Sequence, residues 1–191
     1  YVFVTGWTEE AYGAERVPPE EEVRSAEDDF AFLSHIGWVD DSGNVNIVGE
    51  VRNISDQTFD TLVVVEATLT DSEGNVVEGS FGAYLDRPVI APGENSSFWV
   101  FIASEDLDVD PNSITDYELI LWVTEEPSPD VELSVVDAEA VEEDSAFYID
   151  GTVRNTTELE FVAITVYSTL YDSDGEVINV TSDTYELDVP L

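Results

Sequence analysis

The chain has 191 residues, and its 44 aspartate and glutamate residues outweigh five basic residues, which gives a formal net charge of −39. A surface of that sign has too few cations to displace counterions from phosphate, so nucleic acids and anionic membrane surfaces are excluded as partners. The 43% hydrophobic and 11% aromatic content is too high for an acidic disordered chain. We expect one large or two small folded domains.

The five basic residues are all arginines, and the chain contains no lysine. So many carboxylates destabilise a compact state by self-repulsion unless salt screens them, and at molar ionic strength the screening length falls to about 3 Å. We therefore expect a protein that works in saturating salt. The composition resembles that of proteins from extremely halophilic archaea.

Cysteine and methionine are also missing from the chain. Without cysteine the chain has no disulfide, no thiolate metal site and no cysteine nucleophile. No apolar run approaches the roughly 18 residues of a membrane span, so we expect any anchor to lie outside these residues. Because no initiator methionine is present, we expect the sequence to be a portion of a longer product.

Four of the eight asparagines stand in Asn-x-Ser/Thr sequons, where chance would place about one. Each is a candidate acceptor for an N-linked glycan. The excess favours export to an extracellular or cell-surface location. The candidates are Asn53, Asn95, Asn155 and Asn179.

The first segment, residues 1–29, is expected to form an N-terminal extension. It starts with an apolar, strand-like stretch at Tyr1–Trp7 and continues with an acidic stretch. A second segment outside the folded domains is predicted at 127–130, where two prolines make a stiff linker.

Residues 30–126 show the period of β-strands. Apolar side chains alternate along Val45–Val51, and a β-branched run follows at Leu62–Leu69. A hairpin turn is predicted where Gly74 supplies a positive φ. Two more strands are predicted at 95–102 and 116–123. Six or seven short strands with a turn about every ten residues predict an antiparallel β-sandwich.

The same pattern returns in residues 131–191. Val48–Asn53 recurs as Asp150–Asn155 with an offset of 102, and Thr68–Val77 recurs as Thr169–Ile178 with an offset of 101. A period of this length is far too long for a solenoid unit, so it predicts two tandem domains.

Both repeats carry parts of one motif: Gly-x-Val-x-Asn, a strand, Leu-Tyr-Asp-x-x-Gly-x-Val, and Pro-Gly before a strand with phenylalanine. The second repeat has Leu170-Tyr171-Asp172, with Ser168 in place of the expected phenylalanine. The first has Thr70 in place of the tyrosine but keeps Pro92-Gly93 and Phe98. Over about residues 30–125 and 131–191 the chain resembles the FxLYD family. That resemblance implies immunoglobulin-like, non-catalytic extracellular modules of prokaryotic surface proteins and lipoproteins.

The second domain is expected to lack its last strands. The equivalent of Pro92-Gly93 would fall beyond Leu191, so counterparts of Phe98–Ile102 and Tyr117–Val123 are missing. An incomplete sandwich exposes an apolar core and unpaired strand edges. Three explanations are open: the chain continues, the domain is smaller and open, or an extended segment is donated, with Tyr1–Trp7 as the candidate donor.

No pattern of catalytic residues stands out, and we predict neither an enzyme nor a cofactor or metal site. The one histidine, His35, is predicted to be a half-buried strand residue. Three acidic turns place oxygens near a glycine as calcium loops do, but none has the complete calcium-loop pattern, so metal-free hairpin turns are favoured. The turns are Asp40–Asn44, Asp71–Asn75 and Asp172–Glu176.

The tryptophans are a further feature weighed for ligand binding. Exposed indoles stack on sugars, but on alternating strands they are more often part of the core, and the core is favoured here. The four are Trp7, Trp38, Trp99 and Trp122.

Two functions remain open. The first is a structural one: a spacer or a subunit of a surface assembly or filament, whose partners are proteins or copies of itself, joined by strand addition. The second is a glycan- or protein-binding module of a membrane-anchored surface protein. Exposed aromatic residues clustered at one loop end would favour binding.

The excess of carboxylates generates the first testable prediction. We expect the chain to fold only in molar KCl or NaCl, because the carboxylates repel one another when salt does not screen them. Far-UV circular dichroism and melting temperature, measured as salt is lowered, check this. An unchanged β signal and melting temperature at low salt would contradict it.

Overall fold

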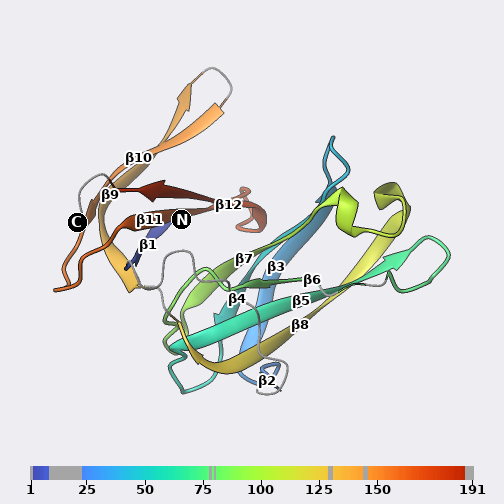
Figure 1. Cartoon of the computed structure of the whole chain (residues 1–191), viewed down its shortest axis with the longest axis horizontal. Helices are drawn as coiled ribbons and strands as arrows, with labels where there is room; N and C mark the ends of the chain where they lie inside the picture. The colour runs from blue at the N-terminus through green and yellow to red at the C-terminus, as the bar shows by residue number, and fades with distance from the viewer. Residues whose placement is uncertain are drawn as a thin grey trace. The chain divides into compact units, whose positions relative to one another are not determined.

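The computed structural model describes residues 2–8, 23–77, 79, 81–128, 131–143 and 146–187. In these residues the protein is built of antiparallel β-sheets, which confirms the prediction of an all-β fold (Figure 1). Their only helical elements are two short 3-10 turns, η1 (Ser104–Asp106) and η2 (Pro111–Ser113). None of the described residues forms a helix long and apolar enough to cross a membrane.

The chain divides into two compact units. We call one the central unit; it comprises Val17–Ser128 and Leu170–Val180. The other, the terminal unit, comprises Tyr1–Arg16, Pro129–Thr169 and Thr181–Leu191. The terminal unit is therefore assembled from segments that are far apart in the sequence.

The central unit contains a four-stranded and a three-stranded sheet. The first has the order β2-β8-β5-β6 and the second the order β3-β4-β7. Strands β4, β5, β7 and β8 cover the four strand segments that the sequence predicts. The bounds are β2 (Val23–Ser25), β3 (Phe30–Val39), β4 (Val45–Asn53), β5 (Thr61–Asp71), β6 (Phe81–Tyr84), β7 (Asn95–Ile102) and β8 (Ile114–Pro127).

A single apolar core lies between these two sheets. Alternate residues of β4 and β7 supply one wall, among them Ile47 and Phe98, and β5 and β8 supply the other, among them Val65 and Leu121. All four side chains are at most 1% exposed. Burial of such side chains contributes about 1.5–3 kcal/mol each, which is the driving force that holds the two sheets together.

The terminal unit contains one five-stranded sheet in the order β10-β9-β1-β11-β12. Two of its neighbouring pairs, β9 with β10 and β11 with β12, are hairpins, and β1 comes from the opposite end of the sequence. The bounds are β1 (Val2–Trp7), β9 (Val131–Glu143), β10 (Ala146–Arg154), β11 (Ala163–Tyr171) and β12 (Val177–Glu186).

The turn between β11 and β12 belongs to the central unit. Tyr171 donates a hydrogen bond of 2.6 Å from its hydroxyl to the carboxylate of Glu50, and the backbone N–H of Val177 donates one of 2.9 Å to Ser34 Oγ. Val177 and Val180 pack with Val48. The tyrosine of the Leu-Tyr-Asp motif therefore contributes a specific contact to the central unit.

The predicted segments 1–29 and 127–130 are described only in part. Within 1–29, β1 joins the sheet of the terminal unit and β2 pairs with β8 of the central unit. The acidic residues Glu20–Glu22 and linker residues 129–130 lie outside the described residues.

One half-buried residue of the central unit, Asp86, carries a carboxyl group that is packed among protein atoms. Asp86 accepts a 2.7 Å hydrogen bond from Ser97 Oγ, and its backbone N–H donates to the carbonyl oxygen of Ser97. Burial raises the pKa of Asp86 from 3.8 to about 7, although the hydrogen bond from Ser97 acts in the opposite direction. The folded protein therefore holds this proton at pH values where an unfolded chain has lost it.

This proton gives a pH-dependence prediction. Between about pH 4 and about pH 7 the unfolded state ionises Asp86 and the folded state does not, so the free energy of unfolding falls as pH rises. Asp86→Asn removes that fall, and we expect its stability relative to the wild type to grow by roughly 1–3 kcal/mol across the interval.

Urea unfolding in molar KCl at several pH values measures the difference. Asp108→Asn, which removes the charge of an exposed aspartate, is the matched control. Equal pH profiles for Asp86→Asn and the wild type would show that Asp86 is ionised in the folded state.

Candidate functional site: an open groove in the terminal unit

The central strand of the terminal unit is β1, which has a neighbour on each side (Figure 1). Residues 2–7 pair antiparallel with residues 163–168 of β11, and residues 4–6 pair antiparallel with residues 131–133 of β9. The side chains of Phe3, Val4 and Thr5 are at most 3% exposed. Among the described residues, β1 is the connection between the β9–β10 and β11–β12 hairpins.

A glycine fixes the register of this strand. A Cβ atom on Gly6 would lie 2.5 Å from Cδ1 of Phe161, and Phe161 is fully buried. The ring occupies the space that the missing side chain leaves. On the same face Val4 packs with Leu133 and Phe161 in a small apolar cluster.

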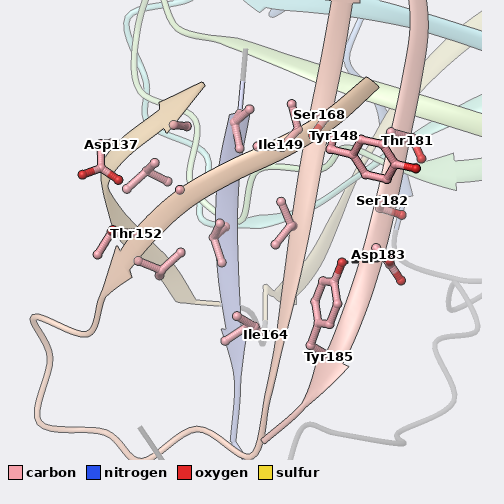
Figure 2. A pocket seen from close by; sticks show the side chains of 17 residues that line it. Asp137, Tyr148, Ile149, Thr152, Ile164, Ser168, Thr181, Ser182, Asp183 and Tyr185 are labelled. Carbon is pink, nitrogen blue, oxygen red and sulfur yellow. Dashed lines mark hydrogen bonds between the residues drawn. The ribbon is translucent and has the colours of Figure 1, made fainter. Parts of the chain in front are cut away.

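Beyond this cluster the same sheet face is open and forms a groove of about 440 Å³ (Figure 2). Aliphatic residues of β1, β9, β10 and β11 line it, including Val4, Val135, Val153 and Val166. Polar residues stand mainly on β12, where Asp183 accepts a hydrogen bond of 3.0 Å from the hydroxyl of Tyr185. The groove is therefore apolar with an acidic and polar rim.

The side chains of β10 are much more exposed than their counterparts in the central unit. Ile47 of β4 is fully buried, whereas Ile149, its counterpart at the offset of 102, is 37% exposed. Tyr148 is 56% exposed. Within the described residues β4 pairs with both β3 and β7, whereas β10 pairs only with β9.

Two of the sequons form the same loop structure. The side-chain amide of Asn53 donates to the carbonyl oxygen of Gln57, and that of Asn155 donates to the carbonyl oxygen of Leu159. In both loops the Ser or Thr two residues on donates its hydroxyl to the asparagine Oδ1. This Asx-type turn ends a strand, so both sequons have a structural reason to be present.

The sequons differ in accessibility. Asn53 is fully buried, and its amide nitrogen also donates to the carbonyl oxygen of Ile90. In the folded state the side-chain nitrogen of Asn53 is thus enclosed, whereas the asparagines of the other three sequons are half-buried. Asn95 accepts a 2.8 Å hydrogen bond from Arg52. Asn155, Asn95 and Asn179 are the accessible candidates.

The three acidic turns share one geometry, in which the first aspartate accepts hydrogen bonds from the backbone N–H groups two and four residues on. The side-chain amide of Asn44 lowers the pKa of Asp40 most, and its backbone N–H adds to this. The backbone N–H of Asn75 lowers the pKa of Asp71 most, and its side chain adds to this. The third residue after each aspartate is a glycine with φ between 83° and 85°. The described part of the chain brings no three potential metal ligands together.

His35 lies on strand β3 as predicted, but its side chain is exposed rather than half-buried. Its Nδ1 lies 2.8 Å from the hydroxyl oxygen of Tyr117. Partial burial lowers the pKa of His35. This contact explains the histidine as part of an aromatic surface pair on the central unit.

The prediction that the tryptophans belong to the core is wrong for Trp38 and Trp122, whereas Trp99 packs against the buried cluster of Val48, Val177 and Val180. Trp38 is 36% exposed, and the other two are half-buried. Trp99 donates to Asn46 Oδ1, and Trp122 donates to a carboxylate oxygen of Glu66. Side chains alternate between the two faces of a strand, so an indole next to core-facing residues in the sequence lies on the opposite face of its sheet.

Sequence reasoning missed the role of Gly6 and the exposure of β10. An isolated glycine in an apolar run gives no sign that a ring 155 residues later fills its place. The repeat could have revealed the exposure of β10. A residue-by-residue comparison with β4 identifies the apolar side chains of β10 that have no neighbouring strand. The sequence matches no family model, and no curated protein or solved structure was found to match it.

The fit of Gly6 against Phe161 generates the third prediction. Gly6→Val should destabilise the terminal unit by about 1–3 kcal/mol, because a buried ring must move to admit the new side chain. Hydrogen exchange should become faster in β9 and β11 and remain unchanged in β5 and β8.

The control is Thr5→Val on the same strand, which removes a buried hydroxyl that makes no hydrogen bond. We expect this change to be neutral or stabilising. If Gly6→Val leaves exchange in β9 and β11 unchanged, β1 does not occupy this position in solution.

Proposed function

We propose that this protein is a non-catalytic structural module of an extracellular or cell-surface protein in an extreme halophile. It acts as a spacer or as a subunit of a surface assembly or filament. In this proposal the two repeats are tandem immunoglobulin-like β-sandwiches related to the FxLYD family, and the second is incomplete within residues 131–191.

The strand pairing of the central unit supports the immunoglobulin-like assignment. With β3, β4 and β7 taken as strands A, B and E, strands β8, β5 and β6 of the other sheet correspond to F, C and C′. Strand β2 precedes strand A in the chain, but it lies at the edge beside β8, where strand G would pair. In the second repeat the β9–β10 hairpin is the counterpart of A and B, and β11 is the counterpart of C. Strand β1 pairs with β11 antiparallel, as β8 pairs with β5, which is the position of strand F. It also pairs with β9, so the terminal unit has its counterparts of A and F in one sheet, whereas the central unit has them in two.

The observation that carries the proposal is that an N-terminal strand completes a sheet otherwise made from residues 131–186. A module whose sheet accepts a strand from a distant part of the sequence is suited to joining segments by strand addition.

The charge and the sequons support the location. Molar salt screens the excess carboxylates, and an exported protein meets such salt outside the cell. In the proposal N-linked glycans occupy Asn155, Asn95 or Asn179, and Asn53 keeps its structural role in the loop.

The second candidate function, a glycan- or protein-binding module, has one observation in its favour. Trp38, Ile36 and Phe101 are between 36% and 51% exposed on the outer face of the β3-β4-β7 sheet. The register places Trp38 and Phe101 opposite Asn46 from its two sides. Exposed aromatic rings on a sheet face are suited to stacking against sugars or to docking a protein.

The fourth prediction separates these functions. Expressed in a halophilic host, the protein should be found outside the cell in a repeating arrangement by electron microscopy, and glycopeptide analysis should find a glycan on at least one accessible sequon. The double variant Trp38→Ala and Phe101→Ala should leave the arrangement intact.

Two outcomes are opposed to the structural proposal. Isolated monomers inside the cell with unmodified asparagines would exclude it. Loss of surface attachment in the double variant, with the fold retained by circular dichroism, would favour the binding module instead.

A further inference from the structure

The central unit shows how the strand equivalent to β10 is covered. There, β4 is covered along its outer edge by β7, with Ile47 opposite Val100 and Gly49 opposite Phe98. A Cβ atom on Gly49 would lie 2.5 Å from the ring of Phe98, so the glycine leaves room for that ring. The internal repeat thus indicates which kind of segment can pair with the outer edge of β10.

Strand β10 has the same residues at the positions that face β7 in the central unit. At the offset of 102, Ile149 and Gly151 correspond to Ile47 and Gly49. A Cβ atom on Gly151 would lie 2.6 Å from the carbonyl oxygen of Asp137 on β9, as one on Gly49 would lie 2.7 Å from that of Ser34 on β3. Ile149 and Gly151 both belong to the lining of the groove, together with Val153 (Figure 2). The isoleucine that β7 and the facing sheet bury completely in the central unit stays 37% exposed here.

We propose that the outer edge of β10 and the adjoining groove bind an extended, β7-like segment of a partner polypeptide. The segment lies antiparallel to β10, places an aromatic ring opposite Gly151 and an aliphatic side chain opposite Ile149, and covers the groove. This inference rests on the proposed function and names the partner of its strand-addition site.

The charges around the groove restrict the partner further. Asp137 of β9 and Asp183 of β12 line the groove, so an acidic segment would be repelled. Strand β7 itself, Asn95–Ile102, has no charged residue in a chain of net charge −39. By analogy with β7, the partner segment is uncharged and carries apolar residues at alternate positions.

A second copy of this chain is a poor source of that segment. The described copy already uses β7 between β4 and the core of the central unit, and β1 between β9 and β11. Donation of either would leave the donor's own core open. The partner segment is therefore an extended one that has no other pairing in its own fold.

A peptide with the sequence of β7 tests the proposal directly. The probe is dye-labelled Asn95–Ile102, added to the full chain in molar KCl and followed by fluorescence anisotropy. We expect saturable one-to-one binding and slower hydrogen exchange in β10, with exchange in β4 unchanged. A peptide with the Phe98→Ala change should bind at least tenfold more weakly, because the place opposite Gly151 stays empty.

Protein variants locate the site. Ile149→Asp should weaken binding of the peptide at least tenfold by placing a charge in the groove, and Val76→Asp, at an exposed valine of the central unit, should leave it unchanged. Circular dichroism and the exchange pattern of β5 and β8 report whether each variant is folded. Because the Phe98→Ala peptide changes no residue of the protein, it tests the proposal even where a variant unfolds.

Three results would overturn the inference: no binding, protection of an edge other than β10, or equal binding by Ile149→Asp. Self-association that Ile149→Asp abolishes would show that a second copy fills the groove. Failure of the peptide to bind, together with an intact surface arrangement in the host, would refute this inference and leave the structural function standing.

Discussion

The terminal unit depends on one interaction, the pairing of β1 with both β9 and β11. Each hairpin alone is a two-stranded ribbon with a marginal core. When β1 lies between them, its backbone groups pair on both sides, and Val4 joins Leu133 and Phe161 in a buried cluster. Gly6 makes this position specific, because a side chain there would collide with Phe161.

The internal repeat works as a controlled comparison of one sequence pattern in two environments. The turn at Asp71 and the turn at Asp172 have the same hydrogen bonds and the same glycine φ near 84°. Local geometry is thus reproduced wherever the local residues are. Burial is not reproduced, since Ile47 is enclosed by a neighbouring strand and a facing sheet while Ile149 stays partly in solvent.

The acidic surface and the apolar cores have opposite effects on the stability of the compact state. Repulsion among the carboxylates favours an expanded chain at low salt, whereas burial of residues such as Phe98 favours the compact state. Salt weakens the repulsion among the carboxylates by screening their charges. At Asp86 a different cost acts, because burial disfavours ionisation of its carboxyl group, and salt does not relieve that cost.

The sequence by itself determined the all-β class, the positions of β4, β5, β7 and β8, and the hairpin turns, because strand period and turn residues act over a few neighbours. It also named Tyr1–Trp7 as a candidate strand for the second repeat. Only the tertiary structure decided that β1 lies between β9 and β11, that Asn53 is enclosed, and that Trp38 faces solvent. These outcomes depend on which segments meet in space, and contacts between residues more than 100 positions apart leave no periodic trace in the chain.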